Sequence, residues 1–152
     1  MHMTDDDLSM GYLMHWGARL TRRLADRRLR ELGFSSAYLP IVGTLAAASQ
    51  PLSQKALAEA VSIEQPTMAA TLARMERDDV VLREADPHDG RSYLFSLTPA
   101  TKRKMPTVRR IIEQVNEEAL SGLPASERAK FRRRLIAAIR GMERELIGGS
   151  NG

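Results

Sequence analysis

Apolar residues recur every three or four positions in the first third of the chain, which is the spacing of one face of an α-helix. The first series predicts one long amphipathic helix that ends at Gly33, a residue suited to a left-handed helix end. The segment Thr4–Asp7 resembles a capping box at its start. A second series predicts a helix from about Ser35 to Ala48. The apolar positions of the first helix are Leu8, Tyr12, Trp16, Leu20, Leu24, Leu29 and Leu32.

The next part of the chain predicts two shorter helices joined by a tight turn. Ser53 is the candidate N-cap of the first, because a serine hydroxyl can accept from a free backbone N–H of the first turn. The turn Val61–Ile63 separates it from a helix that starts near Gln65. Two helices joined in this way form the helix-turn-helix pattern. The expected core-facing residues are Ala56, Leu57 and Ala60 in the first helix and Met68, Leu72 and Met75 in the second.

After these helices the period changes from helical to twofold, which is the alternation of a β-strand. Val80–Leu82 is one β-type run, and Tyr93–Leu97 is another. The segment Asp86–Gly90 lies between them and is rich in turn-forming residues. We predict a two-stranded hairpin with its tip at about Pro87–Arg91. A hairpin directly after a helix-turn-helix is the arrangement of a winged helix.

Two further amphipathic helices are predicted, one from Pro99 to Gly122 and one that opens at Pro124. They and the first helix have more apolar surface than a small winged core can cover, which favours pairing with a second copy of the chain. The expected fold is mainly α with a small β-hairpin wing. It divides into a helical dimerisation region (4–33 and 99–147), a winged helix-turn-helix lobe (35–97) and a disordered tail (148–152).

Composition and charge narrow the class of protein. The chain of 152 residues has no cysteine, which excludes disulfides, thiol nucleophiles and thiolate metal sites. Its 23 basic and 19 acidic residues give a net charge of +4. No run is long enough for a membrane span, and the acidic start does not resemble a signal peptide. We expect a cytoplasmic protein that makes no membrane contact. Basic residues cluster at 19–30, 102–110 and 128–134.

The sequence gives no support to an enzyme. Its histidines, His2, His15 and His88, are scattered, and it has no HExxH motif, nucleophile elbow or phosphate-binding glycine loop. One helical face carries Glu113, Glu117 and Glu118, but no second helix offers the partners of a di-metal site, so a solvated acidic patch is the better interpretation. We expect no catalytic residues, no metal and no cofactor.

The second helix of the helix-turn-helix presents polar residues outside its apolar stripe. Gln and Thr side chains can bond base edges, and Arg can bond guanine or phosphate. The N-terminal end of such a helix is the part that enters a major groove. An ordinary exposed polar face is the alternative interpretation. The candidate DNA contacts on the two helices are Ser53, Lys55, Gln65, Thr67, Thr71 and Arg74, with Thr71 expected beside the outward flank of Thr67 and Arg74.

Arg91 lies near the expected tip of the wing. An arginine on a thin β-projection can reach a minor groove, where narrow A·T tracts concentrate negative potential. Asp89 could brace either the guanidinium or the wing turn. The alternative is a surface arginine paired with Asp86 or Asp89, which would contribute less than ~1 kcal/mol.

Three stretches resemble the MarR family of bacterial transcriptional regulators: Ile63–Val81, then Asp86-Pro-His-Asp-Gly-Arg-Ser, then Ser96-Leu-Thr-Pro. The wing pattern Asp-Pro-x-Asp-x-Arg is the most specific part, and the order of elements matches over almost the whole chain. The resemblance implies a homodimer whose recognition helix reads the major groove while Arg91 enters the minor groove. Two features depart from the family pattern: Ala70 is small, and Asp78-Asp79 replaces a glycine-containing helix end.

The resemblance also implies a small aromatic or phenolic effector held between the dimerisation helices and the DNA-binding lobe. The candidates for this pocket are Tyr12, His15, Trp16 and Tyr38. Tyr12 and Trp16 also belong to the apolar stripe of their helix, so core packing is an open alternative.

The expected function is therefore a homodimeric transcriptional regulator that binds double-stranded DNA at a pseudo-palindromic operator, acts as a repressor and is released by a small aromatic ligand. The alternative function is a winged-helix protein-interaction module without sequence-specific DNA binding. The acidic residues around the recognition helix keep this alternative open.

Overall fold

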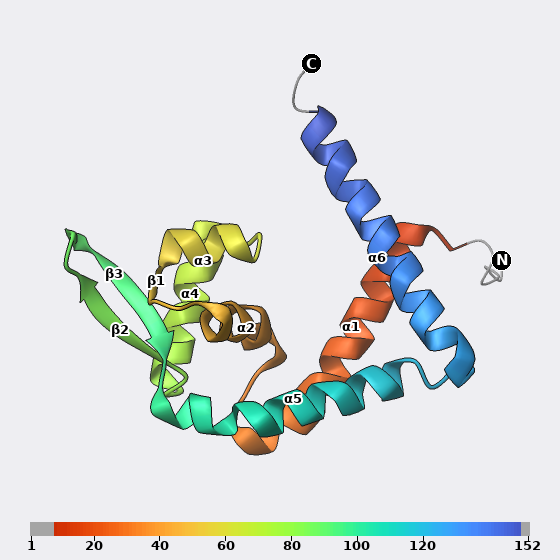
Figure 1. The fold of residues 1–152 in the computed structure, drawn as a ribbon, viewed down its shortest axis with the longest axis horizontal. Helices are drawn as coiled ribbons and strands as arrows, with labels where there is room; N and C mark the ends of the chain where they lie inside the picture. Colours follow the sequence, from red (N-terminus) through yellow and green to blue (C-terminus); the bar gives the residue numbers. More distant parts are fainter. Residues whose placement is uncertain (1–7, 150–152) are drawn as a thin grey trace. The chain divides into compact units, whose positions relative to one another are not determined.

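The computed structural model describes residues 8–149 as a mainly helical chain with one small sheet (Figure 1). The predicted fold class is confirmed. The capping box expected at Thr4–Asp7 lies outside the described residues. The helical elements are α1 (Met10–Leu29), η2 (Arg30–Leu32), η3 (Ser36–Tyr38), α2 (Leu39–Ala47), α3 (Gln54–Ala60), α4 (Gln65–Arg77), α5 (Pro99–Ala119) and α6 (Ala125–Gly148). The strands are β1 (Leu52–Ser53), β2 (Val81–Asp86) and β3 (Asp89–Leu97).

The long first helix begins and ends at polar or flexible residues. The Ser9 hydroxyl accepts from the backbone N–H of Tyr12 at 3.2 Å, which caps α1. Gly33 has φ 68°, a left-handed conformation that glycine adopts without strain, and it ends η2 as the sequence predicts. The carboxylate of Asp26 then accepts from the backbone N–H of Ser36 at 2.6 Å. This bond attaches η3 to α1.

The helix-turn-helix consists of α3 and α4. The Ser53 hydroxyl accepts from the N–H of Ala56 at 3.2 Å, so its predicted capping role is confirmed. Leu57 and Ala58 are buried in α3, whereas Ala60 is exposed next to the turn. The expectation that Ala60 faces the core was therefore wrong. The predicted stripe of α4 is correct, and its members Met68, Leu72 and Met75 are at most 2% exposed.

The wing is part of a sheet with strand order β1-β3-β2, so the prediction of a two-stranded hairpin was incomplete. Leu52 of β1 pairs with Phe95 of β3 in antiparallel fashion. Two residues are too few to show a twofold period, and this is why the sequence does not reveal β1. Asp86 pairs with Asp89 across the turn, so Arg91 lies on β3 just beyond the tip.

The turn after α4 is fixed by two buried threonines, one directly before α5 and one in its first turn. Asp79 has φ 56° and reverses the chain there. The Thr98 hydroxyl donates to the carbonyl of Asp79 at 2.8 Å, and the Thr101 hydroxyl donates to the carbonyl of Val80 at 2.9 Å. Both threonines are at most 2% exposed. Thr98 and Thr101 thus satisfy carbonyl groups of the turn that follows α4.

The chain forms two compact units, and the boundary between them falls within α5 after Val115. This division differs from the functional division into a dimerisation region and a winged lobe, which stays a prediction. The second unit contains α6, which has no buried residue and runs through Gly148 into the segment predicted as a tail. None of the helices in the described part of the chain combines the length and apolarity that a bilayer span requires.

Candidate nucleic-acid interface

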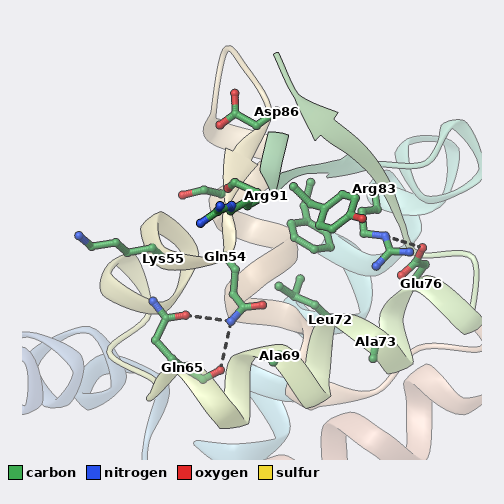
Figure 2. A pocket seen from close by; sticks show the side chains of 14 residues that line it. Gln54, Lys55, Gln65, Ala69, Leu72, Ala73, Glu76, Arg83, Asp86 and Arg91 are labelled. Carbon is green, nitrogen blue, oxygen red and sulfur yellow. Dashed lines mark hydrogen bonds and ion pairs between the residues drawn. The ribbon is translucent and has the colours of Figure 1, made fainter. Parts of the chain in front are cut away.

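A groove of about 590 Å³ runs between α4 and the two long strands of the wing (Figure 2). Its floor on α4 includes Ala69, Leu72 and Ala73, whose short or buried side chains leave room above the helix. Four of the predicted DNA contacts line this groove although they come from separate segments of the chain: Ser53, Lys55, Gln65 and Arg91.

Gln65 stands at the start of α4, at the end of the groove that Lys55 and Arg91 also occupy (Figure 2). The side-chain amide of Gln54 donates to the side-chain oxygen of Gln65 at 2.9 Å and lies 3.4 Å from its backbone carbonyl. Within residues 8–149 the amide nitrogen of Gln65 makes no hydrogen bond, so it can donate to a partner. The first-turn N–H groups of α4 lie at the same end and favour an anion.

The other predicted contacts of α4 do not line the groove. Thr67 and Arg74 are exposed on the neighbouring side of the helix. Thr71 is only 6% exposed, and its hydroxyl donates to the carbonyl of Thr67 at 2.9 Å. Its expected place beside the outward flank was wrong, because position 71 follows Met68 by three residues and shares the core-facing side.

At the wing, Asp89 accepts from the backbone N–H of Arg91 at 3.1 Å. Of the two roles expected for Asp89, the structure thus shows the bracing of the turn. The Arg91 side chain is exposed, and within residues 8–149 its guanidinium forms no ion pair with Asp86 or Asp89. It is available to a partner outside the chain.

The opposite end of the groove holds a cluster that the sequence analysis missed. Arg83 lies 3.3 Å from a carboxylate oxygen of Glu76 and 4.5 Å from the ring centroid of Tyr93. Figure 2 shows Arg83 reaching from β2 toward Glu76 on α4. The signal was present: Arg83 follows the buried Val81 by two residues and therefore shares its side of β2.

Two acidic residues near α4 are engaged within the chain. Glu76 pairs with Arg83, and Asp78 accepts from the Tyr38 hydroxyl at 2.6 Å. Burial, followed by the bond to the Asp78 carboxylate, raises the pKa of Tyr38, so its hydroxyl stays a donor at neutral pH. The ion pair with Arg83 compensates the charge of Glu76, whereas Asp78 keeps its charge; the pair therefore answers part of the objection that the region is too acidic for DNA.

The four effector candidates lie in two different environments. Tyr38 is 3% exposed and its hydroxyl is engaged by Asp78, so it has little surface for a ligand. Tyr12 and Trp16 are 49% and 38% exposed, and their ring centroids are 6.1 Å apart. Core packing within one chain therefore does not account for this pair. His15 is exposed, and none of the four lines the groove. The effector pocket stays a prediction.

The helix-turn-helix α3–α4 followed by the β2–β3 wing makes this chain a winged helix-turn-helix protein. The MarR family model matches residues 44–93, which run from α2 to β3. This match confirms the resemblance that the recognition helix and the wing motif carry. The chain has the fold of MarR-family transcriptional regulators.

Solved structures of such regulators are similar over most of their length. A probable transcriptional regulator from Pseudomonas aeruginosa has a TM-score of 0.77 at 22% identity, covering 87% of this chain and 98% of that one. A MepR–DNA complex from S. aureus has a TM-score of 0.76 at 21% identity, covering 88% and 98%. The apo form of MarR from E. coli has a TM-score of 0.73 at 20% identity, covering 86% and 97%. At these identities the likeness shows the fold.

Proposed function

We propose that this chain is a DNA-binding transcriptional regulator that works as a homodimer and represses promoters by occupying a pseudo-palindromic operator. The observation that carries the proposal is the groove between α4 and the wing, which brings Lys55, Gln65 and Arg91 together. Two of these side chains are cations, and Arg91 has no ion-pair partner within residues 8–149. Such a surface suits a phosphate backbone and the base edges beside it.

In the proposed complex, the N-terminal half of α4 enters the major groove. Gln65 and Thr67 are exposed there, and their side chains can bond base edges. Arg74 contacts phosphate or guanine about two turns further along. The wing carries Arg91 toward the adjacent minor groove. Two subunits place their recognition helices in successive major grooves, with half-site centres about 10 base pairs apart.

Dimerisation is supported by apolar side chains that one chain leaves exposed. On α1 these include Tyr12, Trp16 and Leu20, which are 38–49% exposed. On α6 they include Phe131 and Ile139, which are 43% and 42% exposed. Burying large apolar side chains lowers the free energy by roughly 25 cal/mol per Å². A second copy is the simplest partner that covers these faces.

Relief of repression would follow from a small aromatic ligand that binds the DNA-competent and DNA-incompetent states with different affinity. Tyr12, His15 and Trp16 of α1 are the candidate contacts, at places on this face that the second copy leaves uncovered. The proposed regulator acts in the cytoplasm and carries out no chemistry, because both steps need only differential binding.

The test is to capture genomic fragments with the purified protein and to sequence them. An enriched inverted repeat, bound with an affinity that falls steeply with salt, is the expected result. The slope of log K against log[salt] should be about −0.9 per phosphate neutralised. Absence of an enriched sequence, together with salt-insensitive retention of a protein partner, would favour the protein-interaction module instead.

A further inference from the structure

Two arginines of the wing line the same groove in different states. Arg91 on β3 is exposed, and its guanidinium forms no ion pair within the described residues 8–149. Arg83 on β2 is engaged twice, by the carboxylate of Glu76 at 3.3 Å and by the ring of Tyr93 at 4.5 Å from its centroid. The difference indicates that the two arginines have different tasks.

The strand register explains how one side chain reaches both partners. Arg83 is opposite Phe95, and Tyr93 precedes Phe95 by two residues on the same side of β3. Phe95 is 6% exposed, so this side of the hairpin faces the protein. A planar guanidinium can stack on an aromatic ring while its N–H groups bond a carboxylate. Arg83 therefore connects both wing strands with α4.

The carboxylate of Glu76 is the group that this contact controls. Glu76 lines the groove, and its side chain is 39% exposed. An uncompensated carboxylate there would repel a phosphate backbone. With Arg83 beside it, the pair adds no net charge, and the cations at the opposite end determine the attraction of the groove for DNA.

We propose that Arg83 is a positioning residue for DNA binding, which holds the wing to the recognition helix through Glu76 and Tyr93 and compensates the Glu76 charge without contacting DNA itself. The inference rests on the proposed function and deepens it. In this proposal Arg91 contacts the DNA, whereas Arg83 maintains the geometry of the groove.

A double-mutant cycle tests the assignment. The probe is a fluorescein-labelled duplex that carries the inverted repeat recovered from genomic capture, with a scrambled duplex as reference. Arg83→Ala should weaken binding about fivefold, the effect of an exposed pair worth up to ~1 kcal/mol. The affinity of Glu76→Gln for the duplex should lie within about twofold of wild type. In the Glu76→Gln background, Arg83→Ala should lower the affinity no more than about twofold, because the charge that Arg83 compensates is gone.

Arg91→Ala is the matched control, because Arg91 does not contact Glu76. Arg91→Ala should lower the affinity for the duplex by the same factor with Glu and with Gln at position 76. It should also reduce the salt slope by about 0.9, because a cation bound in the minor groove neutralises about one phosphate charge. Arg83→Ala in the Glu76→Gln background should leave that slope unchanged. Arg83→Lys, which keeps the charge but not the planar face, should recover part of the lost affinity.

Hydrogen exchange of the free protein gives a readout that needs no DNA. In Arg83→Ala the amides of β3 from Asp89 to Tyr93 should exchange faster than in wild type. Three results would overturn the positioning role and leave the proposed function intact. The first is unchanged hydrogen exchange in Arg83→Ala, and the second is an equal loss of affinity from Arg83→Ala with Glu76 and with Gln at position 76. The third is a salt slope that Arg83→Ala reduces by about 0.9 in the Glu76→Gln background. If wild-type protein binds the repeat no better than the scrambled duplex, both the positioning role of Arg83 and the proposed function are overturned.

Discussion

The N-terminal end of α4 is open, whereas its C-terminal end and the turn after it are held by partly or fully buried hydrogen bonds from η3 and from the start of α5. At the open end, Glu64 forms no side-chain cap bond, and Gln65 is exposed beside the groove. At the anchored end, Asp78 is bonded by Tyr38, and the carbonyl groups that follow are bonded by Thr98 and Thr101.

The contrast explains how a recognition helix can hold a fixed orientation and still offer free donors. The anchored end fixes the axis of α4 against η3 and α5, so the open end can present unpaired donors without losing its orientation. Substitutions at the anchored end should therefore affect stability first. Substitutions at the open end and the wing should affect DNA affinity and leave stability almost unchanged.

The largest effect is expected at the anchored end from Thr101→Val. The substitution keeps the shape but removes the buried hydroxyl that donates to the carbonyl of Val80, which then keeps the backbone N–H of Thr98 as a donor at 3.1 Å. The free energy of unfolding should fall by about 2 kcal/mol, because the bond of the buried hydroxyl to Val80 and its contact with the Thr98 hydroxyl at 3.0 Å are lost. Urea titration followed by circular dichroism measures it. Thr107→Val on the same helix is the control, since Thr107 makes no hydrogen bond through its side chain in the described chain. If Thr101→Val and Thr107→Val lower the free energy of unfolding equally, the stabilising role of the Thr101 hydroxyl is contradicted.

Arg91→Ala should have the largest effect on DNA. Loss of a groove contact should weaken binding to the captured repeat by about 1–3 kcal/mol. The free energy of unfolding should stay within about 0.5 kcal/mol of wild type, because the side chain is exposed. Fluorescence anisotropy measures the affinity. Arg77→Ala removes the same charge near the anchored end and should cost much less. A similar loss for both variants would mean that only overall charge matters.

The open end was the easier one to predict from sequence. Gln65, Ser53 and the wing turn are local features, and each is recognised from spacing or from turn chemistry within a few residues. The long helices were equally clear, since Gly33 and Pro99 mark their boundaries. These features identified the winged fold and four residues of the groove.

The anchored end depends on contacts between residues far apart in the chain. Tyr38 and Asp78 are 40 positions apart, and no local pattern pairs them. The structure gives a reason for the departure at Asp78-Asp79 from the family's glycine-containing helix end. Asp78 accepts the Tyr38 hydroxyl, and Asp79 itself adopts the positive φ. Aspartate tolerates that conformation better than most non-glycine residues.

Tyr38→Phe should weaken the anchor less than Thr101→Val does. Loss of the bond to Asp78 should lower the free energy of unfolding by about 1–2 kcal/mol. The pKa of Tyr38 is raised in the folded state. The protonated hydroxyl therefore stabilises the fold at pH values below the unfolded pKa near 10, and this stabilisation is lost as the pH rises through the pKa of the folded state. Wild type and Tyr38→Phe should therefore converge in stability above pH ~10.

Urea titrations at neutral and alkaline pH check this convergence. Tyr93→Phe is the matched control, because within the described chain the Tyr93 hydroxyl makes no hydrogen bond, and the ring that Arg83 covers is kept. It should change stability by less than about 0.5 kcal/mol at either pH. A gap between wild type and Tyr38→Phe that widened at high pH would contradict the stated role of the hydroxyl.

The smallest effect is expected at the open end from Gln54→Ala. Gln54 donates to Gln65 at 2.9 Å and orients its amide, but the contact is exposed to water. Affinity for the captured repeat should fall about twofold to threefold, consistent with a hydrogen bond worth about 0.5 kcal/mol. Stability should not fall, because alanine is a good helix former at that position. Gln50→Ala, which removes an exposed glutamine outside the helices, should bind like wild type. If Gln54→Ala bound like wild type as well, Gln65 would not need its neighbour to read DNA, and the open end would be less organised than the anchored end.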